Sequence, residues 1–528
     1  MKLIKILSLF LIIPSFIFAQ RTISISGTLS VNTQWNFDTV FLSGNVTIPN
    51  DISLSIAAGT KVIAQGYYKI DVKGRLIAIG EPNKFIYFSA LDTARLYDTS
   101  TTKGGWNGLH FESITSNNDS SVLKYCRVEH GKAVGLSRKE KLGGGIYIDS
   151  CSKILIQNCQ IFNNVARLGG AGIQIVNNAS PKIIQNLIKN NFSVLEGGGI
   201  ASLENSAPII QKNIIIENIA FTTSEATPGF IFAHGAGGGI YVSSRTEITP
   251  LISCNLIANN VSVNGAVYES SPYMRCFNNI IVNNYGGGVF HGHQRSHSIY
   301  TNNTICNNED IGFVSASTTV KLYNNIIRNN TVLFPKDSFN VDNILGAWPQ
   351  THYNNIEKMA SQLRGNNNID APTLFVKPTT VPGLNENGYE ADWRLQKGSP
   401  EIDAGTTADG VADIVSTKDF LGNARIQGAT IDMGAIEYSP LSTTTDLNDL
   451  NIKIYPNPFS GQIWIDVNSP LVSGRYSIFS IDGKLISQDI LNQGTQLIQT
   501  EQFAVGSYIL TITDKNGKKI FNSKLIKN

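Results

Sequence analysis

The segment His291–His297, which reads HGHQRSH, holds three of the seven histidines and the greatest local density of side chains that could do chemistry. If it continues a strand, His291 and His293 lie on the same side, where two imidazoles could bind a metal ion, with His297 in the following loop. Alternatively, His293 beside Arg295 could act as a general base. No carboxylate that could complete a metal site is visible nearby, so we assign no metal ligands here. His293 and Arg295 are the candidate catalytic residues.

A second set of candidates lies on the short strands that follow recurring glycine-rich turns, such as GGGIYI at Gly143–Ile148. Because side chains alternate along a strand, outward residues of successive strands form columns. One predicted column contains His110, Tyr147, Gln174, Ala201, Tyr241 and Phe290; the next contains Glu112, Asp149, Val176, Leu203 and Ser243.

Aromatic rings beside amides and carboxylates suit sugar rings, whose C–H faces stack on aromatic faces. The candidate glycan-binding residues are therefore His110, Glu112, Tyr147, Asp149, Gln174, Tyr241 and Phe290. The alternative is that these side chains merely decorate an exposed sheet.

A repeated motif defines the elements that must position these side chains. It reads NLIKNN at Asn186–Asn191 and NIIVNN at Asn279–Asn284, and it returns with a period of roughly 22–28 residues. Its apolar runs are short and bounded by Asn or Gly, which excludes an amphipathic helix. Three strands and three turns per unit predict an all-β, right-handed parallel β-helix of about 11 or 12 coils with a length of about 55 Å.

The first asparagine of each motif is predicted to stack on its counterpart one coil away. Asparagine tolerates the left-handed backbone conformation that a sharp bend needs. Its amide also donates and accepts, so identical residues can form a ladder. The predicted ladder consists of Asn186, Asn213, Asn255, Asn279, Asn303 and Asn325. Function is then expected away from the ladder, on the strand after the glycine turn.

Composition and the N-terminus restrict the setting. The chain has 42 Lys plus Arg against 40 Asp plus Glu, which gives no support for a nucleic-acid partner. Residues 1–20 have a basic start, an apolar run and a small residue at Ala19, as in a cleaved secretory signal peptide. No later stretch is apolar enough to span a membrane.

Cys126 and Cys159 align one coil apart, but parallel stacking is poor geometry for a disulfide bridge. Buried free thiols are therefore expected, with a disulfide as the alternative.

The chain divides into six predicted segments. After the signal peptide at 1–20, residues 21–103 form the N-terminal coils and cap, residues 104–356 the repeat array, and residues 357–438 the ending of the β-helix. Residues 439–450 are a linker, and residues 451–528 are a small β-sandwich. Two insertions, Gly131–Leu142 and Ala220–Ala236, are predicted to overhang the same edge of the first-strand face.

The segment Asp392–Tyr438 resembles the ending of many bacterial right-handed β-helix proteins. The resemblance rests on Trp393–Leu395, Gly398–Pro400, Ile402–Gly405, Gly422–Arg425 and Asp432–Glu437. It implies that the segment terminates the helix and that four charged residues are structural: Asp403, Arg425, Asp432 and Glu437. No cofactor is expected. A calcium site at Asp409, Asp413 and Asp419 is an alternative, although the spacing differs from that of an EF-hand loop.

The tail resembles the C-terminal sorting domain of type IX secretion cargo in Bacteroidetes. The matching residues are Tyr455–Pro458, Asp482–Lys484, Gly506–Ile509 and Lys524–Asn528. The resemblance implies that residues 451–528 engage the type IX secretion machinery. It also implies removal of the tail after export, followed by release or attachment at the outer-membrane surface.

Enzymes on the pectate-lyase-like β-helix fold include pectate and chondroitin lyases and polygalacturonases. The polygalacturonase motifs Asn-Thr-Asp, Asp-Asp, Gly-His-Gly and Arg-x-Lys do not occur in this chain. The fold alone does not show that a protein has any of these activities. We therefore expect a secreted or cell-surface monomer that binds extracellular polysaccharide or acts as an adhesive scaffold, and we favour such a role over an enzymatic one. The alternative is a polysaccharide lyase acting on uronate-containing polymers, whose residues follow no short motif.

Overall fold

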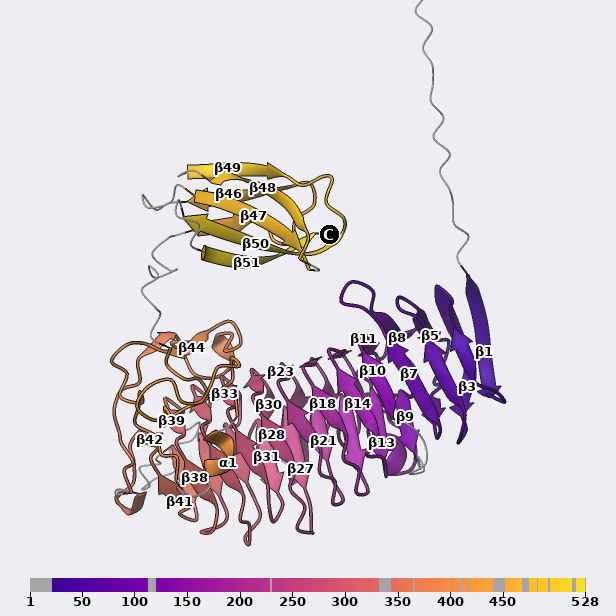
Figure 1. The fold of residues 1–528 in the computed structure, drawn as a ribbon. Coiled ribbons are helices and arrows are strands. Elements are labelled where there is room, and N and C mark those ends of the chain that lie inside the picture. Colours follow the sequence, from indigo (N-terminus) through magenta and orange to yellow (C-terminus); the bar gives the residue numbers. More distant parts are fainter. Residues whose placement is uncertain are drawn as a thin grey trace, which may run out of the picture. The chain divides into compact units, whose positions relative to one another are not determined.

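The computed structural model describes residues 21–112, 120–227, 230–331, 343–363, 366–408, 411–415, 417–439, 452–467, 474–481, 483–491, 494–514 and 519–527. The predicted signal peptide and most of the predicted linker lie outside these residues. The chain divides into two compact units, Met1–Tyr438 and Ser439–Asn528 (Figure 1).

The first unit is a solenoid of parallel strands, which confirms the predicted all-β β-helix. One coil contains β13 (Ile146–Asp149), β14 (Ile154–Gln157), β15 (Gln160–Phe162) and the short β16 (Val165–Ala166). Each strand pairs in parallel with its counterpart in the next coil. The fourth strand adds to the three predicted per coil, and its equivalents form a sheet of five strands.

The strands fall into columns along the solenoid. After the glycine turns come β9 (Leu109–Glu112), β13, β17 (Ile173–Val176), β21 (Ile200–Ser202), β27 (Ile240–Ser243), β31 (Val267–Ser270), β34 (Val289–His291), β37 (Phe313–Ser315) and β40 (Ile344–Gly346). The second column is a 12-stranded sheet: β2 (Thr33–Trp35), β4 (Ser53–Ile56), β7 (Arg75–Ile79), β10 (Ser121–Lys124), β14, β18 (Lys182–Ile184), β22 (Ile209–Gln211), β28 (Leu251–Ser253), β32 (Arg275–Phe277), β35 (Ile299–Thr301), β38 (Lys321–Tyr323) and β41 (Gln350–His352).

The third column contains β8 (Ile86–Ala90), β11 (Cys126–Glu129), β15, β19 (Leu187–Lys189), β23 (Ile214–Ile216), β29 (Leu256–Ala258), β33 (Ile280–Val282), β36 (Thr304–Cys306), β39 (Ile326–Arg328) and β42 (Asn355–Ile356). The short fourth strands are β12 (Lys132–Ala133), β16, β20 (Phe192–Ser193), β24 (Ile219–Ala220) and β30 (Val261–Ser262). The first coils use β1 (Thr22–Thr28), β3 (Thr39–Ile48), β5 (Lys61–Ala64) and β6 (Ile70–Val72), and a hairpin of β25 (Thr222–Thr227) and β26 (Phe230–His234) lies within the second predicted insertion.

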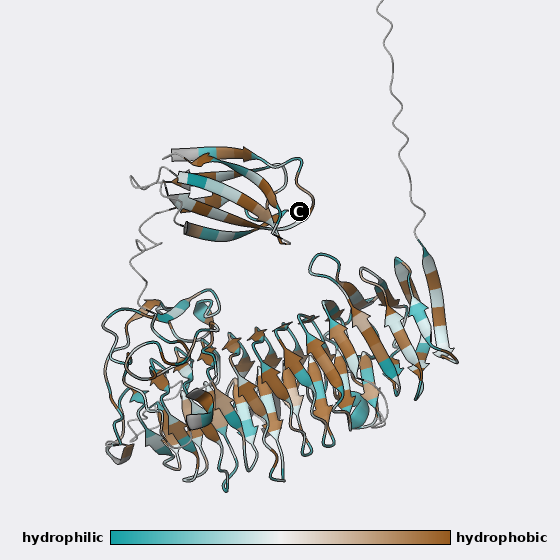
Figure 2. Ribbon diagram, viewed as in Figure 1, coloured by the Kyte–Doolittle hydropathy of each residue, from teal (hydrophilic) through white to brown (hydrophobic). Residues whose placement is uncertain are grey.

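The solenoid interior is a stack of aliphatic side chains. Ile161, Ile188, Ile215 and Ile257 occupy the same position in successive coils, and all are fully buried. Figure 2 shows hydrophobic residues concentrated on the strands and hydrophilic residues in the turns. Burial of a column of this kind supplies the hydrophobic stabilisation that a single coil cannot provide.

Two asparagine ladders run along this stack. In the first, the Asn186 amide nitrogen donates to the Asn213 amide oxygen at 2.9 Å, and equivalent bonds of 2.9–3.0 Å continue through Asn255, Asn279, Asn303, Asn325, Asn354 and Asn368. The second ladder was not predicted: Asn164, Asn191, Asn218, Asn260, Asn284, Asn308, Asn330 and Asn343 are joined in the same way.

The predicted backbone role of the ladder asparagines is wrong. The left-handed conformation belongs to the residue before each one, as at Gln185 (φ 58°), Lys212 (φ 56°) and Asn278 (φ 57°). Lysine and glutamine rarely adopt this conformation. We infer that the ladder bonds on the following residue hold the bend, so that asparagine is required for its amide and not for its backbone preference.

The segment after β42 first closes the end of the solenoid and then returns along its side. Asparagines at the bends donate to backbone carbonyls of this segment: Asn259 to Glu386 at 2.8 Å, Asn283 to Gly383 at 3.0 Å, Asn307 to Thr379 at 2.7 Å and Asn324 to Thr406 at 2.9 Å. Its elements are β43 (Phe375–Lys377), η3 (Gly383–Asn385), β44 (Asp392–Leu395) and α1 (Ala412–Val415). Closing the end of the solenoid is therefore only part of the role of this segment, because most of it covers the third-column strands.

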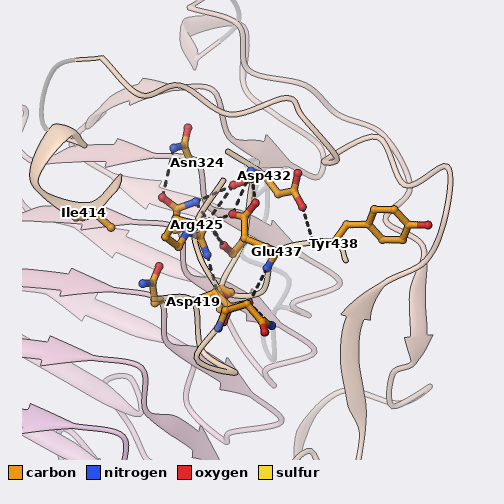
Figure 3. A network of polar contacts seen from close by, with 12 residues as sticks. Asn324, Ile414, Asp419, Arg425, Asp432, Glu437 and Tyr438 are labelled. Carbon is orange, nitrogen blue, oxygen red and sulfur yellow. Dashed lines mark hydrogen bonds and ion pairs between the residues drawn. The ribbon is translucent and has the colours of Figure 1, made fainter. Parts of the chain in front are cut away.

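A buried ionic network fixes this segment (Figure 3). Arg425 is fully buried, and its guanidinium lies 2.7 Å from the Glu437 carboxylate. Arg425 also donates to the carbonyls of Asp432, Gly434 and Ala435. Asp432 accepts from the Asp403 amide at 2.7 Å. These contacts are all within the protein and support a structural role for the four charged residues.

The second unit is a small antiparallel β domain. One sheet contains β45 (Ile452–Tyr455), β46 (Gln462–Val467) and β49 (Gly494–Gln499); the other contains β47 (Gly474–Ser480), β48 (Leu485–Leu491), β50 (Gly506–Asp514) and β51 (Lys519–Lys527). Phe459, Ile478, Leu510 and Leu525 belong to a hydrophobic core that is separate from that of the solenoid.

Replacing one ladder residue tests the role of the amide. In Asn279→Leu, the Asn255 backbone N–H loses its acceptor at 2.9 Å, and the Asn303 amide oxygen and the Ile252 carbonyl lose a donor at 3.0 Å. Leaving such buried groups unpaired should lower the free energy of unfolding by roughly 1–3 kcal/mol. Chemical denaturation measures this, with the exposed Asn83→Leu as control; equal stability of the two variants would remove the ladder argument.

Candidate functional site

A polar cavity of about 480 Å³ lies on the first-strand face of the solenoid. We call it the Tyr241 cavity. Its lining consists of Arg138, Glu196, Leu203, Glu204, Asn205, Tyr241, Ser243, Ser244 and Arg245. Of these residues, Tyr241 alone is among the candidate ligands predicted from the sequence.

Three segments far apart in the sequence build the cavity. Tyr241 and Ser243 lie on β27, and Leu203 follows β21, the neighbouring strand in the solenoid. Glu196 lies in a turn, where it bridges Gly169 and Ala236. Arg138 comes from the insertion Gly131–Leu142, next to the 3-10 helix η1 (Lys139–Lys141). The insertion therefore supplies a cation that no strand of the repeat provides.

Tyr241 begins a stack of aromatic rings. Its ring centroid lies 4.8 Å from that of Tyr268 at an interplanar angle of 2°, and Tyr268 lies 5.4 Å from Phe290 at 11°. Tyr268 was missing from the predicted column because its coil lacks the triple-glycine signature. Stacking covers both faces of Tyr268, so the predicted contact of sugars with ring faces cannot occur there. On its other side Tyr241 pairs with Ala201 and packs against the apolar cluster that includes Leu203, and its side chain is half-buried.

The surroundings of Tyr241 and Glu196 favour the protonated forms of both side chains. Burial raises the pKa of the Tyr241 hydroxyl well above its ordinary value, and the neighbouring Glu196 carboxylate adds to this. Burial also raises the pKa of Glu196, although the charge of Arg138 acts in the opposite direction. A phenol held in this form is a hydrogen-bond donor and a poor general base near neutral pH.

Three of the seven candidate glycan-binding residues are buried. His110 is 4% exposed, Tyr147 3% and Gln174 0%. Tyr147 packs with Leu142 of the insertion and with Val176 and Leu203. The expectation that these side chains lie on an exposed sheet is therefore wrong, because neighbouring side chains and the insertion cover them.

The predicted acids Glu112 and Asp149 bind cations from the same chain. The Lys139 ammonium lies 2.6 Å from Glu112 and 3.9 Å from Asp149, and His110 Nδ1 lies 3.0 Å from Glu112. Burial would raise the pKa of Glu112, but hydrogen bonds from His110 and Lys139 and the charge of Lys69 outweigh it and lower the pKa to about 2. The arrangement is a structural ion network under the insertion.

The histidine cluster does not form a shared site. β34 ends at His291, whose side chain is fully buried inside the solenoid, and His293 lies in the following turn. The Arg295 backbone N–H donates to His293 Nδ1 at 3.3 Å, and His297 stacks on Tyr273 at 5.5 Å. The prediction that His291 and His293 face the same side is wrong, because the strand stops between them.

His291 instead contacts a buried glutamate that the sequence analysis missed. Its Nε2 lies 3.0 Å from Glu269 Oε2, and both side chains are 0% exposed. Tyr300 and Ser298 donate hydrogen bonds to the Glu269 carboxylate. Burial raises the pKa of Glu269 to about 7 and lowers that of His291 to about 4. The sequences VYES and VFHG align with the IYV part of GGGIYV, whose third residue is the inward-facing Val242. Glu269 and His291 occupy this third position, so the repeat alone could have predicted that both face inward.

The proposed calcium ligands are engaged by protein groups. Asp413 pairs with Arg275 at 2.7 Å, and Asp419 accepts from the backbone N–H groups of Asn423 and Glu437. Asp409 lies outside the described residues. Within the described part of the chain, no group of three or more His, Cys, Asp or Glu side chains is arranged to hold a metal ion.

All six cysteines are buried free thiols.

Two family models match the chain. Residues 86–305 match the model described as a right handed beta helix region, and residues 453–528 match the secretion system C-terminal sorting domain. No curated protein matches the chain. Among the described residues, no helix is long and apolar enough to cross a membrane.

The Glu112 network predicts a defined pH dependence. Because folding lowers the pKa of Glu112 from 4.5 to about 2, its stabilising contribution is complete above about pH 4.5 and disappears as the pH falls toward 2. Glu112→Gln should therefore be less stable than wild type near neutral pH, and the difference should shrink over that window. Denaturation at stepped pH measures it, with the exposed Glu81→Gln as control. A pH-independent difference would contradict the assignment.

Proposed function

We propose that this chain, a right-handed β-helix protein with a type IX secretion sorting tail, is an exported glycan-binding protein whose ligand site is the Tyr241 cavity. The sorting domain at residues 453–528 indicates use of the type IX machinery and a location at the cell surface or in the medium.

The lining of the Tyr241 cavity carries this proposal. The half-buried ring of Tyr241 lies beside hydroxyl, amide, carboxyl and guanidinium groups. Sugars present an apolar C–H face and a rim of hydroxyl groups, so they need both kinds of contact. Asn205, Ser243 and Arg245 supply hydrogen-bond donors to the cavity, and Arg138 and Glu196 supply charges.

Lyase action is the second candidate, because Arg138 and Arg245 could neutralise the carboxylate of a uronate residue. It needs a base in addition. The raised pKa of Tyr241 makes its phenolate scarce near neutral pH, and His293 and Arg295 lie in a turn that contributes nothing to the cavity lining. Binding is therefore the better supported function.

A glycan array with the purified exported protein tests the proposal. We expect binding to a subset of polysaccharides, and we expect Tyr241→Ala and Arg138→Ala each to weaken it roughly tenfold or more, as loss of a charge-assisted or stacking contact would. Affinities of the best array ligand for each variant provide the measurement.

Matched controls lie close to the cavity. Tyr268→Ala removes a ring from the same stack but no lining residue, and Arg167→Ala removes an exposed arginine elsewhere on the solenoid. Both should keep wild-type affinity. Equal losses in Tyr241→Ala and Tyr268→Ala would place the ligand elsewhere. Formation of unsaturated product from an acidic polysaccharide, followed by ultraviolet absorbance, would establish the lyase instead.

A further inference from the structure

The second-column sheet carries cations and no acids. Its twelve described strands contain no Asp or Glu, and their cationic residues are Arg75, Lys124, Lys182, Arg275 and Lys321. The chain as a whole is nearly balanced, with 42 Lys plus Arg against 40 Asp plus Glu. Because charges of one sign on a single face attract groups of the opposite sign, this sheet is suited to an acidic partner.

One part of this face already holds an acidic segment of the chain itself. The outward residues Leu251, Arg275 and Ile299 lie side by side on β28, β32 and β35. Figure 1 shows α1 against this part of the sheet, and the Asp413 carboxylate lies 2.7 Å from the Arg275 guanidinium. Leu251 and Ile299 pack against the apolar cluster that contains Ile414. A cation between two aliphatic residues thus binds a carboxylate whose neighbours are aliphatic.

The same triplet of side chains occurs in the same column nearer the N-terminus. Leu155, Lys182 and Ile209 lie side by side on β14, β18 and β22, and we call them the Lys182 triplet. Successive coils are about 4.8 Å apart, so both triplets present aliphatic and cationic groups at the same intervals.

The Lys182 triplet is uncovered. The Lys182 side chain is exposed, and it makes no ion pair with any residue that the structure describes. Leu155 and Ile209 are partly exposed, and in Figure 1 no described segment crosses β14 and β18 as α1 does farther along the sheet. An exposed apolar and cationic surface of this kind is typical of a contact with another molecule.

The two kinds of group in the triplet restrict the partner. Lysine pairs with an anion, while leucine and isoleucine gain from burial against apolar groups. Polysaccharides and nucleic acids supply anions but no aliphatic side chains. A peptide with an acidic residue beside aliphatic ones supplies both, as Val411–Ile414 (VADI) does at Arg275.

We propose that the Lys182 triplet docks an acidic, aliphatic peptide segment of another protein, in the way that Arg275 and its neighbours hold the segment around Asp413. A carboxylate of the partner pairs with Lys182, and its aliphatic neighbours cover Leu155 and Ile209. Because the Lys182 cation is exposed, added salt weakens the contact. The triplet belongs to the second column and the Tyr241 cavity to the first, so the two sites can be tested separately.

A fluorescent peptide with the sequence of Val411–Val415, VADIV, blocked at both ends, is the probe. Fluorescence anisotropy with the purified full-length chain should show saturable binding that weakens as salt is added. Lys182→Glu should weaken this binding at least tenfold, because attraction of the carboxylate becomes repulsion. The peptide VANIV, which lacks the charge, should show a similar loss with the wild-type chain.

Two matched variants provide controls. Lys61→Glu makes the same change at an exposed lysine on β5, outside the second-column sheet, and should bind VADIV as wild type does. Arg275→Gln should also keep the affinity, because the probe does not need the site that α1 occupies.

Three results overturn the proposal. The first is absence of VADIV binding, and the second is binding that Lys182→Glu leaves unchanged or that Lys61→Glu or Arg275→Gln weakens equally. The third is binding of polygalacturonate that is tighter than that of VADIV and is lost in Lys182→Glu, which would assign this face to an acidic polysaccharide.

Discussion

The constraint on which the solenoid depends is that polar backbone groups buried at each bend must find partners in an adjacent coil. A single asparagine in each coil satisfies this constraint, because its backbone and its side-chain amide both form hydrogen bonds to adjacent coils. The Asn186 backbone N–H and side chain both donate to Asn213 Oδ1 at 2.9 Å, and the Asn186 amide also donates to the Ile156 carbonyl at 3.0 Å. A substitution in one coil therefore leaves groups unpaired in its neighbours, which accounts for the return of asparagine at this position in coil after coil.

The same constraint explains what could be predicted from sequence. A period set by hydrogen bonds between coils is visible as NLIKNN and NIIVNN, so the fold, the strand columns and the first ladder followed from the repeat. The backbone conformation did not follow, because asparagine is common both at ladder positions and at the preceding left-handed ones. Coils with Gln185 or Lys212 before the ladder residue separate the two roles.

Exposure could not be predicted in this way, because it depends on segments outside the repeat. Tyr147 and Gln174 are outward by alternation yet buried, and Tyr147 packs with Leu142 of the insertion and with Val176 and Leu203. The third-column strands are covered by the returning C-terminal segment, where Trp393 and Met433 pack on Ile280 and Val282. Contacts of this kind join residues more than a hundred positions apart, and no local pattern marks them.

Regular stacking also limits where a ligand can bind. In a continuous column each side chain covers the next, as Tyr268 is covered by Tyr241 and Phe290. A binding site on the first-strand face therefore requires an interruption: a small residue such as Ala201 beside a large one, and an insertion that adds a charge the repeat does not supply, as Arg138 does. The two occur together at the Tyr241 cavity. In a solenoid, the departures from the period are consequently better guides to function than the repeated residues themselves.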